Sequence, residues 1–345
     1  MKIGALIGCG FFAQNHIQAW NDISGVRIDA VCDLDKSKAE AFSKQFGGAQ
    51  VFSSIDQMLN AHDLDFIDIA TVAASHRTIV EQVCGHADLI ICQKPFAENL
   101  ADAQTMVSAV QATGAQLLIH ENFRWQKAFV TMKALLDKGR IGAPHFARFS
   151  FRHGYDNYAN QPYLAEIKRF TIMDVGLHLF DLARHFMGDV TRQSCTTQRV
   201  NPIVKGEDVF TALLAHDSGA TSTIDCSFYS KIDPEPFPQT AAWVEGNLGT
   251  LELRTNFELV VHGAGTHEIL NVEPPVPHWG ERPWHNVQDS VIRLQTHATE
   301  IMAGKTGPQP SGRDNLKTMA LALAAYDSAE TGQTIDMTRW KAGAK

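Results

Sequence analysis

The sequence has no long apolar run and no concentrated stretch of basic residues. None of its apolar runs approaches the roughly 20 residues that a membrane-spanning helix needs, and the formal net charge of the 345 residues is −8. These absences argue against a membrane or a nucleic acid as a partner. The short apolar start lacks a small-residue cleavage site, so we expect a cytoplasmic protein.

Cysteine spacing gives no sign of a disulfide framework or a zinc site. None of the six cysteines forms a CxxC pair, and several lie in apolar segments such as AVCD (30–33) and LIICQ (89–93). We therefore predict buried free thiols. Internal repeats and low-complexity tracts are also missing, and the 44% hydrophobic content is that of an ordinary folded protein.

The first 120 residues alternate between short apolar segments and amphipathic ones. Strands are expected at 2–8, 27–33, 65–70, 88–93 and 116–120, and helices near 13–21, 36–46, 55–61, 76–85 and 100–113. Strands that are apolar throughout and alternate with helices indicate a doubly wound parallel sheet. The sequence therefore predicts an N-terminal α/β domain of the Rossmann type.

The pattern changes after a helix expected near 125–138. Between 144 and 273 the sequence is rich in β-forming residues, and its turn signals AHDSGA and EGNLGT predict hairpins. A helix at 174–187 interrupts this region. We therefore expect a first domain at 1–122 and a second domain at 123–345, which is α+β with an open, mostly antiparallel sheet.

The C-terminal part continues with a Pro-rich, aromatic segment at 271–285 and two helices. The segment is either a mobile loop or a flap over a substrate. The helices, near 285–303 and 313–331, could pack back on the first domain.

The segment GCGFFA (8–13) has the spacing of a dinucleotide-binding loop between a strand and a helix. Gly8 would permit the tight turn, Gly10 would admit the pyrophosphate, and Ala13 would allow close packing of helix and strand. Asp33 ends the next strand, where a carboxylate binds ribose hydroxyls. The predicted cofactor-binding residues of this region are Gly8, Gly10, Phe11, Phe12, Ala13 and Asp33.

Asp33 favours NAD over NADP, because its carboxylate repels a 2′-phosphate. Lys36 and Lys38 lie close by and could offset that repulsion. A glycine-rich turn in another α/β protein, such as a methyltransferase, is the alternative reading of the loop.

The segment ICQKPF (91–96) places Lys94 at the end of a buried strand. Pro95 cannot donate a ladder hydrogen bond, so the strand should end there. Ligands of open α/β sheets bind at this edge. Asn122 follows the next strand at the same edge, and we predict that both residues contact a ligand.

The segment TIMDVGLHLFDLARHF (171–186) carries an ionisable stripe on an otherwise apolar helix. At about 100° per residue, Asp174, His178, Asp181 and His185 fall within one narrow arc. A buried stripe of this kind needs an internal partner or a cleft. We predict that Asp181 and His185 form structural contacts. Two ligands at this spacing could hold a metal, but no further ligand is evident, so we expect none.

These motifs resemble those of the glucose–fructose oxidoreductase/inositol dehydrogenase (Gfo/Idh/MocA) family over nearly the whole chain. The resemblance is carried by IGCGFFA, IATVAASH (69–76), the QKP triplet, NFRW (122–125), DVGLHLFD (174–181) and SGRDNLKTMALALAAYDSAETGQ (311–333). Members of this family pair a Rossmann domain with an open β-sheet domain, and they oxidise or reduce sugars and polyols with NAD(P).

The resemblance implies roles for individual residues. Lys94 matches the family's lysine at the substrate and nicotinamide, while Asp174 and His178 match its acidic residue and its proton-transferring histidine. Thr71 and His76 match positions that line the cofactor. We add Gln93 and Asn122 to the predicted cofactor contacts, and Asn122 and Gln161, from the loop before the helix, to the predicted substrate contacts.

The sequence departs from the family pattern at several places. Gln93 stands where Glu usually begins the triplet, Val72 replaces a proline, and RFTIMD lacks the usual Gly-Gly before Asp174. A neutral amide beside Lys94 removes a charge that would hold its ammonium form. These changes place the chain in a subgroup of the family.

Together, the motifs predict an NAD-dependent dehydrogenase of a small sugar or polyol. We expect His178 to act as a base, since an unperturbed pKa near 6.5 suits that role. Asp174 would orient His178 or bind a hydroxyl, and Lys94 would bind the reacting oxygen. The expected reaction is oxidation of an aldose at its anomeric carbon to the lactone, with hydride transfer to the nicotinamide C4. The segments GCGFFAQNH and ICQKPFA resemble those of family members that oxidise a branched pentose, D-apiose, which is therefore the expected aldose.

The sequence is also compatible with other activities. They are an inositol or anhydrosugar dehydrogenase, a closed-cycle oxidoreductase that retains its cofactor, and a non-catalytic dinucleotide sensor. The broad sheet of the second domain predicts a homodimer or a homotetramer, because an exposed sheet of that size usually meets a partner.

Overall fold

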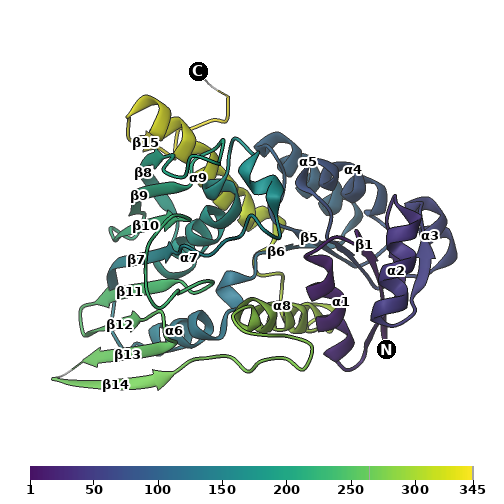
Figure 1. Cartoon of the computed structure of the whole chain (residues 1–345), viewed down its shortest axis with the longest axis horizontal. Helices are drawn as coiled ribbons and strands as arrows, with labels where there is room; N and C mark the ends of the chain where they lie inside the picture. The colour runs from purple at the N-terminus through teal and green to yellow at the C-terminus, as the bar shows by residue number, and fades with distance from the viewer. Residues whose placement is uncertain (264, 344–345) are drawn as a thin grey trace. The chain divides into compact units, whose positions relative to one another are not determined.

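The computed structural model describes residues 1–263 and 265–343 and divides the chain into two compact units. Unit 1 comprises Met1–Asn122 and Ser290–Lys317, and unit 2 comprises Phe123–Asp289 and Thr318–Lys345. Figure 1 follows the chain through both units. The segment 290–317 therefore belongs to unit 1, although the second expected domain includes it.

Unit 1 contains a parallel sheet with the strand order β3-β2-β1-β4-β5-β6 among the described residues. Its strands are β1 (Lys2–Ile7), β2 (Val26–Cys32), β3 (Gln50–Phe52), β4 (Phe66–Ile69), β5 (Leu89–Gln93) and β6 (Gln116–His120). Its connecting helices are α1 (Ala13–Asp22), α2 (Lys36–Phe46), α3 (Ile55–Ala61), α4 (Ala73–Val83) and α5 (Leu100–Thr113). The order reverses between β1 and β4, and ligands bind outside the carboxyl ends of the strands at such a point.

The predicted doubly wound fold is confirmed, and the local signals explain its element ends. The Asn99 side chain accepts the Asp102 backbone N–H at 2.9 Å and begins α5, while Gly114 ends it with a left-handed φ of 79°. Strand β3 was not predicted, since three residues are too few to show a strand period.

Unit 2 contains a mixed sheet with the order β14-β13-β12-β11-β7-β10-β9-β8-β15 among the described residues. The strands are β7 (Pro144–Arg152), β8 (Val190–Gln198), β9 (Val209–His216), β10 (Thr221–Ser227), β11 (Ala241–Gly246), β12 (Gly249–Leu253), β13 (Glu258–Gly263), β14 (Thr266–Asn271) and β15 (Ile335–Asp336). Only the β7–β10 pair of this described sheet is parallel. The expected hairpins β9–β10 and β11–β12 are confirmed.

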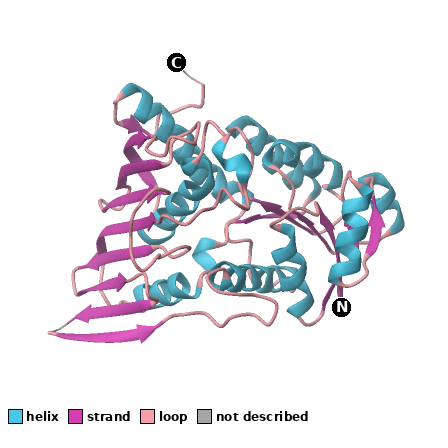
Figure 2. Cartoon of the chain, in the orientation of Figure 1, coloured by secondary structure: helices cyan, strands magenta, loops and turns pink. Residues whose placement is uncertain are grey.

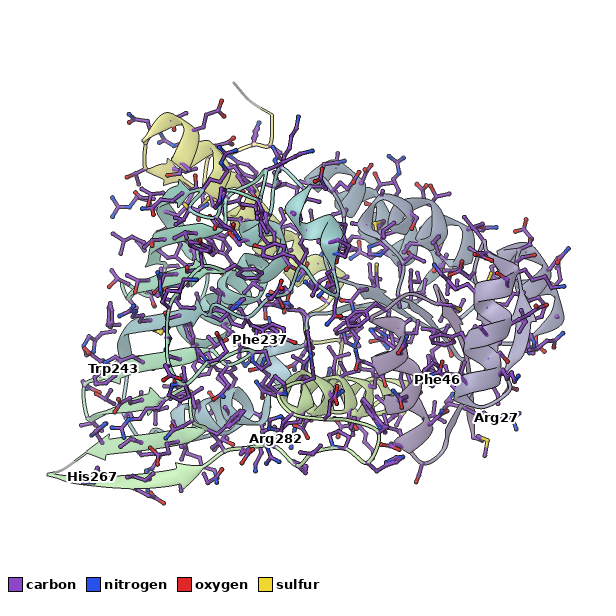
Figure 3. All side chains as sticks on the ribbon, in the orientation of Figure 1. Arg27, Phe46, Phe237, Trp243, His267 and Arg282 are labelled. Atoms are coloured by element: carbon purple, nitrogen blue, oxygen red, sulfur yellow. The ribbon has the colours of Figure 1, made fainter. Side chains whose placement is uncertain are left out.

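One face of this sheet carries the core of unit 2. Helices α6 (Lys127–Asp137) and α7 (Leu177–Met187) lie on that side in Figures 1 and 2. Phe149 of β7 is fully buried between Phe129 and Phe186 of the two helices. The alternating side chains point the other way, as Figure 3 shows for Trp243.

The helix expected at 174–187 begins differently from the prediction. A π-helical turn, η3 (Ile172–Gly176), precedes α7, so Asp174 lies on a wider turn than the expected helix provides. The spacing argument assumed 3.6 residues per turn throughout, which the wider turn at Asp174 does not provide. It holds for the residues within α7.

The remaining elements follow the expected order. The 3-10 turns are η1 (Phe123–Trp125) and η2 (Pro162–Ala165), and the late helices are α8 (His285–Met302) and α9 (Gly312–Thr331). Five of the six cysteines are buried and Cys84 is half-buried. Among the described residues, no helix combines the length and apolarity that crossing a membrane requires.

Candidate active site

The dinucleotide loop of unit 1 depends on its glycines. Gly8 has a φ of +98°, and a Cβ built on it would come within 2.8 Å of the Ala70 carbonyl oxygen. A Cβ on Gly10 would instead meet no atom within 4 Å. The Gly8 backbone is therefore fixed by the fold, whereas Gly10 leaves open space where a pyrophosphate could approach.

The start of α1 completes this loop. Ala13 is fully buried as the first residue of the helix, and Phe12 at the N-cap offers no side-chain acceptor to the helix amides. Phe11 is about half exposed. The amides at the start of α1 can thus serve an anionic ligand.

Asp33 links the end of β2 to the same loop. One carboxylate oxygen accepts the Cys9 backbone N–H at 2.9 Å, and the other accepts the Asp35 N–H at 3.0 Å. These bonds fix a half-buried carboxylate beside the glycine loop, where ribose hydroxyls bind in this fold. The loop, the helix start and Asp33 together fit a dinucleotide.

Lys94 follows β5 directly and is half-buried. Its backbone N–H donates to the Gln93 side-chain Oε1 at 2.6 Å. The Gln93 side chain is itself buried, as is Asn122, whose Nδ2 donates to the Ser290 hydroxyl at 2.6 Å. The register pairs Gln93 with His120 of β6, so β5 and β6 end at the same edge.

Thr71 and His76 connect the ends of β4 and β5. The buried His76 ring lies 3.1 Å from both the Thr71 and the Phe96 carbonyl oxygens, and burial lowers its pKa. The Thr71 hydroxyl accepts a bond from Ser75 at 2.9 Å. His76 therefore supports the backbone around Thr71 within unit 1.

In unit 2, the Glu207 side chain holds the turn that carries Asp174. Its carboxylate accepts the backbone N–H groups of Phe170 and Ile172 at 3.2 and 3.0 Å, and the Tyr326 hydroxyl at 2.7 Å. This anion at the start of a helical segment satisfies amides that the segment itself cannot. Burial, together with the neighbouring Glu207 carboxylate, raises the pKa of Tyr326.

His178 lies on the first turn of α7 and is buried. Its ring stacks on Phe123 with centroids 3.8 Å apart and planes 2° apart. Asp174, in η3, is half-buried and its backbone N–H donates to the Phe170 carbonyl at 2.9 Å. Phe123 therefore fixes the plane of the His178 imidazole.

The outer members of the ionisable stripe make structural contacts. Asp181 is fully buried and accepts two bonds of 2.7 and 2.5 Å from Arg124, which is a structural contact of the predicted kind. His185 is half-buried with its ring edge-to-face against Phe186. Gln161 lies before η2 and accepts the Tyr163 hydroxyl at 2.9 Å.

Sequence reasoning missed His153, which follows β7. The side chain is 1% exposed and lies among Phe151, Phe228 and Phe237. Burial lowers its pKa to about 4, against the opposite effect of the Asp174 carboxylate. A single histidine after a strand has no periodicity that would reveal this position. The described residues also contain no group of three His, Cys, Asp or Glu side chains arranged to hold a metal ion.

The loop, Asp33 and the strand order define unit 1 as a dinucleotide-binding domain. Residues 3–121 match the model of an oxidoreductase family with an NAD-binding Rossmann fold, and residues 129–252 match the GFO/IDH/MocA C-terminal domain. The chain belongs to the Gfo/Idh/MocA oxidoreductase family. It is an enzyme that uses NAD as its cofactor, as the sequence predicts.

Several relatives are similar over nearly their full length. The chain is 45% identical to the D-apiose dehydrogenase of Rhizobium rhizogenes over 97% of both chains. It is 46% identical to the D-apiose dehydrogenase of Paraburkholderia graminis, over 99% of this chain and 91% of the relative. An oxidoreductase from Agrobacterium radiobacter, solved with NAD+, L-tartaric acid and magnesium, is 45% identical over 98% of both chains with a TM-score of 0.95.

Proposed function

We propose that the chain is an NAD-dependent sugar dehydrogenase that oxidises D-apiose at its anomeric carbon to the lactone. The observation that carries the proposal is the 45–46% identity to two D-apiose dehydrogenases over nearly the whole chain. The family's ionisable residues Lys94, Asp174 and His178 are all retained. A dinucleotide sensor would not need them, so their presence favours catalysis.

The proposed chemistry assigns one task to each residue. His178 takes the proton of the reacting hydroxyl, Lys94 binds the oxygen of that hydroxyl, and Asp174 orients His178 or binds a neighbouring hydroxyl. The glycine loop, Asp33 and the predicted contacts Thr71, Gln93 and Asn122 would hold NAD, whose nicotinamide C4 supplies the hydride acceptor when the cofactor is bound. Hydroxyl proton and carbon-bound hydride thus leave together, which balances oxidation of the sugar to the lactone.

The contacts of His178 support its assignment as the base. Stacking on Phe123 restricts rotation of the imidazole, and the buried position limits exchange of its proton with water. The amide oxygen of Gln161 accepts the Tyr163 hydroxyl, and the amide NH2 group is a donor suited to a sugar hydroxyl.

The test is NADH formation by the purified enzyme across aldoses, branched pentoses, inositols and anhydrosugars, with NADP run in parallel. We expect NAD reduction to be fastest with D-apiose, and lactone to be the product. A faster reaction with an inositol or an anhydrosugar would overturn the assignment of D-apiose as the substrate. If no compound of the panel leads to NADH formation, and the purified enzyme retains tightly bound NADH, the chain would instead be a closed-cycle oxidoreductase.

We also propose that the enzyme forms a homodimer or homotetramer through the outer face of the unit 2 sheet. Leu213 of β9 and Ile269 of β14 are 54% and 52% exposed, and the strand registers place Trp243 of β11 on the same face between them. Exposed apolar side chains on one broad face are typical of an interface. Sedimentation should give an oligomer, and Leu213→Glu should shift it toward monomer. A monomeric parent at micromolar concentration would overturn this proposal.

A further inference from the structure

The buried side chain of Gln93 joins two parts of unit 1. Its Oε1 accepts the Lys94 backbone N–H at 2.6 Å, and its Nε2 lies 3.0 Å from Nε2 of His16 on α1. His16 is fully buried. One amide therefore connects a helix side chain to the backbone of the lysine that follows β5.

His16 is held from its other ring nitrogen. Nδ1 lies 2.8 Å from Oδ2 of Asp68, a fully buried residue of β4, and the ring stacks on His120 at a centroid distance of 4.1 Å. The Gln295 amide also donates to the His16 carbonyl at 3.2 Å. The imidazole is thus fixed in position and in plane.

The chemistry of these contacts permits one arrangement of hydrogens. Because the Gln93 oxygen serves Lys94, the Gln93 NH2 group must face His16 as a donor. His16 then accepts at Nε2 and donates from Nδ1 to Asp68, which is the neutral tautomer of the ring. In this arrangement Gln93 donates to His16, and His16 donates to Asp68.

This arrangement also accounts for glutamine where the family usually has glutamate. A carboxylate at position 93 has no hydrogen to give to Nε2, so His16 would have to carry two protons to serve both sides. Gln93 allows a neutral His16 and leaves Asp68 as the one carboxylate bonded to it.

We propose that His16, fixed by Asp68, holds the Gln93 amide and through it the backbone of Lys94, so that His16 and Asp68 are positioning residues for this lysine. The inference rests on the proposed function, in which Lys94 contacts the reacting oxygen. A displaced lysine would lose contact with that oxygen in the transition state, so the loss falls mainly on turnover with D-apiose, while the glycine loop and Asp33 still bind NAD+.

Two substitutions at His16 separate positioning from packing. His16→Gln keeps an acceptor at the Nε2 end, toward Gln93, whereas His16→Asn keeps a donor at the Nδ1 end, toward Asp68. We expect His16→Gln to retain kcat within about threefold, and His16→Asn to lower kcat about tenfold or more. The melting temperature should rank in the opposite order, because His16→Gln leaves the buried Asp68 with fewer donors.

A structural role alone would make kcat follow the melting temperature, and that result would overturn the proposal. A kcat equal to that of the parent in both variants would also overturn the proposal. His62→Asn, at a histidine that follows α3 and contacts Gln50, is the matched control and should behave as the parent.

Combination with Lys94→Ala tests the route through the lysine. If His16 acts through Lys94, then adding His16→Asn to Lys94→Ala should lower the residual rate less than about twofold. A further tenfold loss would overturn the route. Full turnover by Lys94→Ala alone would instead overturn the proposed function of Lys94, so the two failures are distinguishable.

Discussion

The dinucleotide loop of unit 1 and the catalytic segment of unit 2 are held in place by different means. The loop takes its shape from its own backbone, since Gly8 needs a positive φ and leaves no room for a Cβ. The turn that carries Asp174 is held by Glu207, a side chain from a distant part of the sequence. Substitutions should therefore disturb the dinucleotide loop mainly at its own residues. The catalytic segment should also be disturbed by substitutions at residues that never touch the ligand.

The largest effect should come from removing the proposed reacting groups. His178→Ala and Lys94→Ala should each lower kcat about 10²- to 10⁴-fold, the usual contribution of general acid–base and oxyanion groups. Fluorescence titration should show NADH affinity close to that of the parent, because the glycine loop is intact. Normal turnover by either variant would remove that residue from the mechanism.

The two glycines sharpen the comparison within the loop itself. Gly8→Ala should weaken NAD binding about tenfold or more and also lower the melting temperature, because φ is +98° and the new Cβ would come within 2.8 Å of Ala70. Gly10→Ala should weaken NAD binding without changing the melting temperature, because its Cβ meets no protein atom within 4 Å. Titration calorimetry and thermal melts measure both effects. Equal melting temperatures for the two variants would contradict this account.

Glu207 tests the side-chain support in unit 2. Glu207→Gln keeps one acceptor oxygen for three donors, so we expect about 1–3 kcal/mol lower unfolding free energy and a several-fold lower kcat. Tyr326→Phe removes only the hydroxyl donor and leaves both backbone bonds to Glu207. It should lower stability by about 1 kcal/mol with kcat unchanged. Urea unfolding measures the stability of both variants, and steady-state kinetics measure their kcat. A kcat equal to that of the parent in Glu207→Gln would contradict the support role of Glu207.

The same difference explains what the sequence could predict. The doubly wound sheet follows from the alternation of apolar strands with helices, and Asp33 and Lys94 follow strand ends as expected, because local patterns determine both. The antiparallel second sheet was also predictable from its turn signals. These features depend on residues that are close together in the sequence.

Features made by distant side chains were not predictable. The π turn at Asp174 depends on Glu207, and the orientation of Gln93 depends on His16 and Asp68, which lie on other elements. Asp181 was expected to make a structural contact, but the sequence did not identify Arg124 as its partner. A sequence pattern reports the face on which a residue lies, not the side chain that meets it.

The smallest effect that we predict concerns His153, the buried histidine of unit 2 that no pattern revealed. Neither ring nitrogen has a hydrogen-bond partner within the part of the chain that the structure describes, and burial among Phe151, Phe228 and Phe237 lowers the pKa to about 4. In the unfolded chain the pKa should be near 6.5. Between these values the unfolded state binds a proton that the folded state does not, so stability falls as the pH is lowered.

His153 should therefore contribute about 1.4 kcal/mol to the loss of unfolding free energy between pH 7.5 and 5.5, since pH 5.5 lies one unit below the unfolded pKa. The other buried histidines with lowered pKa values, His76 and His216, act in the same direction and remain in the variant. Replacing His153 by leucine should reduce the pH-dependent loss by that amount and no more. Urea unfolding of the parent and of His153→Leu at both pH values isolates the contribution of His153. At pH 7.5 the ring is neutral in both the folded and the unfolded state, so the difference in unfolding free energy there reports packing alone. An unchanged pH dependence in His153→Leu would mean that this ring gains its proton in the folded protein as readily as in the unfolded one.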